Sequence, residues 1–212
     1  MSLSRRLALL EWSREAHAWI VEDDYDSEYR FSGRPLEALH GLDRAGRVLY
    51  IGTFSKVLFP SLRLGYVVAP PELLPGLIAT QRLIVVHLPL LEQMALADFI
   101  AEGHFARHLR RMYLLYRERR NALVDALTRE LGNRLDVTVP EAGMHLVAWL
   151  PSGMSGQAAA QRAAASGLHI LPISQFSLQS LQRDGLVLGF ASASPQELRA
   201  GVHTLALALQ EH

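Results

Sequence analysis

Three short apolar runs in the first third of the chain restrict its fold more than any other feature. They occupy residues 19–24, 48–53 and 64–69; turn residues, among them Gly33, Pro35, Gly41 and Gly46, separate the first two, and Pro70-Pro71 closes the third. Such runs are typical of strands, and their lack of polar alternation is typical of a sheet covered on both faces. Apolar residues at helical spacing predict a helix over 3–17. Helix, strand, loop and strand in this order predict an α/β fold.

The remainder of the chain is predicted to be mostly helical and to end in a small α+β region. Ser194, Pro195 and Glu197 form a capping-box pattern that predicts the start of the last helix. The pattern suggests two lobes, 1–100 and 101–212. Further helices are predicted at about 71–85, 90–101, 103–131 and 155–166, and further strands at about 133–139, 145–150, 168–171 and 186–190.

Composition excludes several classes of function. Lys+Arg and Asp+Glu number 21 each, so the net charge is zero and predicts no bulk attraction to nucleic acid or membrane. The absence of cysteine excludes disulfides and thiolate metal sites. No apolar run is long enough to predict a membrane span or a signal peptide, so we expect a cytoplasmic protein.

Lys56 is the only lysine among 21 basic residues. Arginine cannot lose its proton at any working pH, so a lysine kept alone indicates a need for an amine that can. Apolar residues follow it at 57–60, and the dry setting that they predict would favour the neutral amine. Such an amine can attack an aldehyde. The alternative is an ordinary solvated lysine.

Polar side chains near Lys56 extend this hypothesis. Thr53, Ser55 and Arg63 offer hydroxyls and a cation to a phosphate, although Arg63 could equally form an ion pair. Asp23 and Tyr25 end the first strand and project to one face, although acidic turns are common after strands. An amine, a phosphate clamp and an acid–phenol pair together suit pyridoxal phosphate.

Residues 21–30 and 52–66 resemble the core motifs of fold-type I class I/II aminotransferases. The likeness is greatest to the aminotransferase-like domain of MocR-type GntR transcriptional regulators. It extends more loosely through 140–146 and 186–191. It implies part of a pyridoxal-phosphate-binding large domain in 1–100 and a C-terminal small domain in 101–212.

The resemblance also implies a role for each candidate residue. Lys56 would form the Schiff base, Asp23 would pair with the pyridine nitrogen, and Tyr25 would pair with the phenolic oxygen. The phosphate would contact Arg63 with Ser55 or Thr53. The substrate or effector would be a small amino compound.

Two features depart from the family pattern. Only 22 residues precede Asp23, so we expect an N-terminally truncated chain that lacks part of the cofactor site. This leaves open whether the chain catalyses a reaction alone. Val187 occupies the place where the family carries its carboxylate-binding arginine. Arg183 lies nearby in a polar turn, and no carboxylate-binding residue is assigned.

Three hypotheses follow. The first is an aminotransferase-like effector fragment of a MocR-type regulator, which would reach DNA only through an absent N-terminal domain. The second is a fragment of a genuine aminotransferase, and the third is a folded module without cofactor. An exposed sheet edge and apolar face predict a homodimer or other self-association.

Several other residues are not assigned to a site. The arginines of 107–120 predict a solvated helix face rather than a nucleic-acid surface. His104 and His108 lack a third metal ligand nearby, and no metal is predicted. Trp12 and Trp19 are predicted to lie in the core.

Overall fold

The structure is a computed structural model that describes residues 1–33, 37–85 and 88–210. It divides into two compact units. Unit 1 comprises Met1–Glu28 and Gly33–Leu109, and unit 2 comprises Tyr29–Ser32 and Arg110–His212. Helix α5 (His104–Leu131) begins in unit 1 and continues into unit 2. The predicted division after residue 100 stays a prediction about domains.

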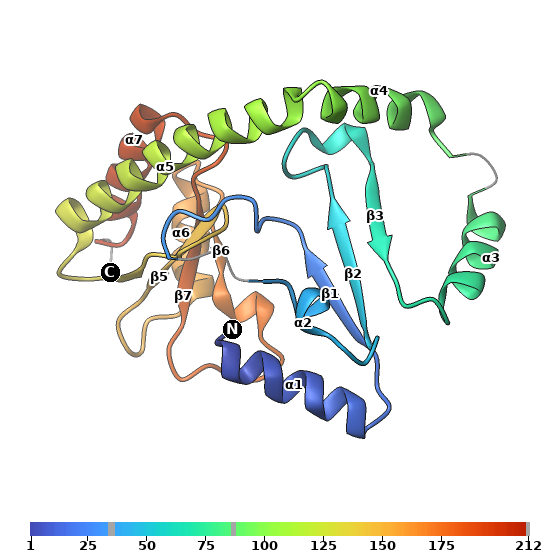
Figure 1. Cartoon of the computed structure of the whole chain (residues 1–212). Coiled ribbons are helices and arrows are strands. Elements are labelled where there is room, and N and C mark those ends of the chain that lie inside the picture. The colour runs from blue at the N-terminus through green and yellow to red at the C-terminus, as the bar shows by residue number, and fades with distance from the viewer. Residues whose placement is uncertain (34–36, 86–87, 211–212) are drawn as a thin grey trace. The chain divides into compact units, whose positions relative to one another are not determined.

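Unit 1 is built around a three-stranded sheet of order β1-β2-β3 (Figure 1). Strands β1 and β2 are parallel, and β3 is antiparallel to β2. The helices and strands agree with the predicted ones to within about three residues, except for two short helices, α2 and η1, that were not predicted. The elements are α1 (Leu3–Glu15), β1 (Ile20–Asp24), α2 (Leu39–Leu42), β2 (Val48–Thr53), η1 (Pro60–Leu62), β3 (Gly65–Val68), α3 (Leu74–Ile84) and α4 (Leu90–Ala101).

The two faces of this sheet are covered unequally. The Glu22 carboxylate accepts hydrogen bonds from the backbone N–H groups of Leu39 (2.8 Å) and His40 (3.0 Å), which holds α2 over one face. Strand residues alternate between faces, so Val21 and Val67 belong to the other face, where they are 60% and 50% exposed. The expectation that both faces are covered is therefore wrong for this chain.

The two tryptophans of unit 1 also lie outside the core. Trp12 is 52% exposed, and Trp19 is 36% exposed beneath the Arg47 guanidinium, which lies 4.7 Å from its ring centroid. The prediction that both are core residues is wrong. An amphipathic ring can instead provide a surface for a cation.

Unit 2 holds a four-stranded antiparallel sheet of order β4-β5-β7-β6. Its two central strands, β5 and β7, bury alternate residues. Leu146 pairs with Leu188 and Ala148 pairs with Leu186, and all four are buried. The predicted strand at 168–171 is wrong for most of its length, since β6 begins only at Leu171. The elements are β4 (Asp136–Thr138), β5 (His145–Trp149), α6 (Gly156–Ala165), β6 (Leu171–Pro172), η2 (Ile173–Phe176), β7 (Gly185–Gly189) and α7 (Pro195–Ala208).

Two local devices fix the ends of helices in unit 2. The capping box predicted at Ser194 and Glu197 is present at the start of α7. The Asp184 carboxylate accepts hydrogen bonds from the backbone N–H groups of Gly156 (2.8 Å), Ser174 (3.2 Å) and Gly185 (2.8 Å). The Asp184 carboxylate thus links the N-terminus of α6 to η2 and to the first residue of β7.

Within the described residues, no helix combines the length and the apolar character that a membrane crossing needs.

Candidate functional site

The six predicted site residues lie at one end of the unit 1 sheet. Asp23 and Tyr25 are at the carboxyl end of β1, and Thr53 ends the parallel strand β2. Ser55 and Lys56 lie in the turn that follows β2. The remaining residue, Arg63, precedes β3, whose first residue pairs with Thr53. Ligands of α/β sheets commonly bind at this end of parallel strands.

The β1 end presents Asp23 and Tyr25 together. In the register Asp23 is beside Ile51 and Asp24 is beside Gly52, so alternation sends Asp24 to the opposite face. The negative charge of Asp26, partial burial and the charge of Asp23 raise the pKa of the Tyr25 phenol. Tyr25 therefore keeps its proton at neutral pH and can donate a hydrogen bond.

Asp24 fixes the position of this strand end from the opposite face. Its carboxylate accepts hydrogen bonds from the Tyr50 hydroxyl (2.7 Å), the Ser27 hydroxyl (2.7 Å) and the Ser27 backbone N–H (3.2 Å). Burial and the hydrogen bond to Asp24 raise the pKa of Tyr50, so the phenol remains the donor. The contact joins β1, β2 and the turn after Tyr25.

A glycine in β2 provides the space for a neighbouring aromatic ring. A Cβ atom placed on Gly52 would lie 2.3 Å from Cζ of Tyr66, its cross-strand partner. No real Cβ contact is that short. The Tyr66 ring therefore crosses directly over Gly52, with its centroid 6.1 Å from that of Tyr50 and 5.6 Å from that of Phe54.

The turn after β2 is held by its own hydrogen bonds and leaves Lys56 exposed. The Thr53 hydroxyl oxygen accepts from the Ser55 backbone N–H at 3.2 Å. Leu58 N–H donates to the Phe54 carbonyl at 2.9 Å, which closes the turn around Lys56. Val57 is 2% exposed, whereas Lys56 is exposed. The expectation of a dry setting around Lys56 is therefore wrong for this chain, because Lys56 is exposed and, of residues 57–60, only Val57 is fully buried.

Arg63 adopts an uncommon backbone conformation. Its φ of 52° lies in the left-handed region, which costs about 1 kcal/mol for a residue with a Cβ. The residue is exposed and lines a groove of about 420 Å³ with Phe54, Leu64 and residues of α4. This volume lies within the range of small-molecule sites. A strained, exposed cation beside such a groove is consistent with an anion-binding role.

The side-chain types at this sheet end fit pyridoxal phosphate. They comprise one primary amine, one carboxylate, a protonated phenol, two hydroxyls and a guanidinium. These are the groups that an aldehyde, a pyridine nitrogen, a phenolic oxygen and a phosphate would require. Whether they bind the cofactor stays a prediction. Among residues 1–33, 37–85 and 88–210, no group of three or more acidic, histidine or cysteine side chains could hold a metal.

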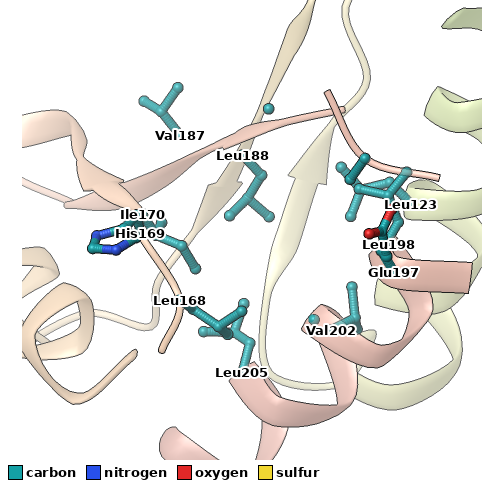
Figure 2. Close-up of a pocket in the computed structure, with 13 residues that line it drawn as sticks. Leu123, Leu168, His169, Ile170, Val187, Leu188, Glu197, Leu198, Val202 and Leu205 are labelled. Atoms are coloured by element: carbon teal, nitrogen blue, oxygen red, sulfur yellow. The ribbon is translucent and has the colours of Figure 1, made fainter. Parts of the chain in front are cut away.

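A separate cavity in unit 2 does not contain any of the six residues (Figure 2). It measures about 230 Å³, below the usual range for ligand sites, and leucine and valine side chains form most of its wall. Leu168, Leu188 and Leu205 point into it, whereas Val187 points away from the other labelled side chains. This cavity is therefore not the candidate site.

Sequence reasoning missed several residues that support the site. Asp24 and Tyr50 gave no signal, since their contact depends on strand register. His108 was considered only as half of a metal pair, but its Nε2 lies 2.8 Å from the Val57 carbonyl oxygen. A carbonyl can only accept, so Nε2 carries the proton. No pattern in the sequence alone reports such a contact between residues 51 positions apart.

Comparison with known families gives a match over nearly the whole chain. The family "Aminotransferase class I and II" matches residues 3–205. The chain is 45% identical over 208 residues to "Probable rhizopine catabolism regulatory protein MocR" of Rhizobium meliloti. That alignment covers 97% of this chain and 42% of the relative.

Solved structures give the same result. The chain matches the crystal structure of Pyrococcus horikoshii kynurenine aminotransferase with a TM-score of 0.92 and 29% identity, over 100% of this chain and 52% of that one. It matches the α-aminoadipate aminotransferase LysN of Thermus thermophilus, complexed with N-(5'-phosphopyridoxyl)-L-leucine, with a TM-score of 0.88 and 33% identity. That match covers 99% of this chain and 54% of the other. The chain thus spans about half the length of these proteins.

Proposed function

Because the chain belongs to the class I and II aminotransferase family, we propose that it is the pyridoxal-phosphate-binding, aminotransferase-like effector part of a MocR-type transcriptional regulator. The cofactor that the family implies is pyridoxal phosphate. One observation supports the site above all others. The parallel register of β1 and β2 brings Asp23 and Tyr25 to the sheet end where Thr53, Ser55 and Lys56 follow β2.

Each residue has a proposed role toward the cofactor. The Lys56 amine would hold it covalently, and the Asp23 carboxylate would keep a proton on its ring nitrogen. Tyr25 would donate a hydrogen bond to its phenolic oxygen, since the raised pKa keeps the phenol protonated. Thr53, Ser55 and Arg63 would bind its phosphate. When bound, the cofactor supplies a conjugated ring that accepts electrons from the bonds of an attached amino compound.

The proposed ligand is a small amino compound that competes with Lys56 for the cofactor. In a regulator, the two bound states would favour different conformations, and the difference in binding free energy would shift the equilibrium between them. Contact with DNA is assigned to a part of the regulator that this chain does not span. The chain itself has zero net charge, so it offers no general attraction to a polyanion.

A genuine aminotransferase is the second candidate. The match to LysN at 33% identity and a TM-score of 0.88 favours it. The higher identity to MocR, 45% over nearly the same residues, favours the regulator. The two differ in an observable way, because an enzyme releases the keto product of the amino compound, whereas a pure effector domain returns the compound unchanged.

Covalent capture tests the proposed attachment. The chain is incubated with pyridoxal phosphate, treated with borohydride, digested and mapped by mass spectrometry. Lys56 is the only lysine, so the N-terminal amine is the only other primary amine that could be labelled. We expect one label per chain, on Lys56. The matched control is Lys56→Arg, which keeps the charge but removes the nucleophilic amine.

The outcome separates the three hypotheses. A label on Lys56 that is lost in Lys56→Arg supports cofactor binding. A label only on the N-terminal amine, or equal labelling of both variants, would contradict it and favour a folded module without cofactor. Keto product from added amino compounds would support the enzyme over the regulator.

A further inference from the structure

We infer that His108 is a positioning residue for Lys56, and that it acts through the backbone carbonyl of Val57. The inference rests on the proposed function of Lys56 as the attachment residue. His108 lies in the first turns of α5, and its Nε2–H donates to the Val57 carbonyl oxygen at 2.8 Å. Val57 follows Lys56 directly, so the hydrogen bond fixes the peptide next to the lysine.

A second residue of the same helix holds the other side of the turn. Phe105 lies one turn before His108, on the same helix face. Its ring meets that of Phe54 edge to face, with centroids 5.8 Å apart. Phe54 and Val57 flank Ser55 and Lys56 in the sequence. Helix α5 therefore contacts both ends of the turn, at Phe54 and Val57, whereas Lys56 between them is exposed.

Burial differs across the turn in the way that this role requires. Val57 is 2% exposed and His108 is half-buried, so solvent competes poorly for their hydrogen bond. Lys56 is exposed, and no hydrogen bond of its own within the described residues would restrict its reach. The backbone therefore sets where the Lys56 side chain begins, and the His108 hydrogen bond is one polar contact that reaches the turn from outside it.

Two substitutions of similar size separate the hydrogen bond from the packing. His108→Met keeps most of the side-chain volume and removes the donor, whereas His108→Gln keeps an N–H donor at a similar reach. His104→Ala is the matched control on the same helix, because the His104 ring contacts Glu102 and Phe99 rather than the lysine turn. Circular dichroism of all variants checks that the overall helix content is retained.

The first measurement needs no cofactor. Hydrogen exchange of the backbone amides in residues 54–59 is followed by mass spectrometry. We expect His108→Met to raise the exchange rate roughly fivefold, the factor that loss of one neutral hydrogen bond gives. His108→Gln should restore the wild-type rate, and His104→Ala should leave it unchanged.

The second measurement follows borohydride-trapped pyridoxal phosphate on Lys56. We expect slower trapping in His108→Met and rescue in His108→Gln. Unchanged exchange in His108→Met, or equal exchange in the Met and Gln variants, would overturn the inference. If the wild-type chain takes no label while exchange changes as expected, the proposed function fails and the role of His108 in holding the lysine turn stands.

Discussion

The two units differ in how much of their apolar surface they bury. Among the described residues, unit 1 has five buried apolar residues and 22 large apolar residues that are exposed. Unit 2 has 24 buried and seven exposed by the same measures. All six predicted site residues belong to unit 1. The unit that carries the candidate site is therefore the one with the smaller core.

This difference separates stability from function along the chain. Burial of apolar surface is the main source of folding free energy, so unit 2 is expected to supply most of the stability. Unit 1 presents exposed leucine, isoleucine and methionine side chains on α3 and α4, which favour association with other apolar surfaces. Four substitutions test this comparison.

The largest effect is expected in the core of unit 2. Phe190 is 0% exposed, and its ring centroid lies 6.0 Å from that of Phe31. Phe190→Ala should lower the free energy of unfolding by about 3–5 kcal/mol, because it removes a large apolar side chain and leaves a cavity. Urea unfolding followed by circular dichroism measures this change. A loss below about 1 kcal/mol would contradict the assignment of stability to unit 2.

The next effect concerns a carboxylate. Burial alone would raise the pKa of Asp184, but hydrogen bonds from the backbone of Gly185 and Gly156 and from Ser174 outweigh it and lower the pKa. Its stabilisation is thus present above the pKa of the unfolded carboxyl and is lost as the pH falls through the lower, folded pKa. Asp184→Ala should cost about 2–3 kcal/mol at neutral pH.

The control for this substitution is Asp184→Asn, which keeps an acceptor oxygen but cannot titrate. Its unfolding free energy should change less than that of the wild type as the pH is lowered below about 4. If the unfolding free energies of Asp184→Asn and the wild type fell equally with pH, Asp184 would not contribute to the loss of stability in acid.

A smaller loss is expected at the start of α7. The Ser194 hydroxyl accepts from the Glu197 backbone N–H at 3.3 Å, and the Glu197 carboxylate accepts from the Ser194 backbone N–H at 2.7 Å. Ser194→Ala removes one of these two bonds and should cost about 1 kcal/mol. Thermal unfolding provides the measurement. Ser194→Asp, which retains a capping oxygen, should stay close to the wild type.

The smallest effect on stability, and the largest on association, is expected in unit 1. Leu83 is 85% exposed and Leu91 is 79% exposed. The double substitution of both by serine should change the unfolding free energy by less than about 0.5 kcal/mol. It should lower the self-association seen by light scattering. A wild-type chain that is already a monodisperse monomer would contradict the predicted association.

Local patterns predicted most of the fold. The strand at 48–53 and the helix at 90–101 begin and end at the predicted residues, because apolar runs and flanking turn residues define them. The capping box at Ser194 was also predicted correctly, since it depends on neighbours in the sequence. Burial was harder to predict. Trp12 and Val21 are apolar but exposed, because no element of the described chain covers them.

The candidate site shows the same limit at finer scale. The chemistry of Lys56, Asp23 and Tyr25 could be proposed from residue types, and parallel pairing of β1 and β2 explains why they meet. Their supports could not be proposed in this way. The contact of His108 with Val57 depends on how α5 packs against the lysine turn, which no local pattern encodes.

The close approach of Tyr66 to Gly52 has a consequence for variation between related proteins. Any side chain at position 52 would displace the Tyr66 ring, and a smaller residue at position 66 would remove that restriction. Substitutions at the two positions should therefore be tolerated together more often than apart. Among relatives, glycine at position 52 should accompany an aromatic ring at position 66, and the two positions should covary.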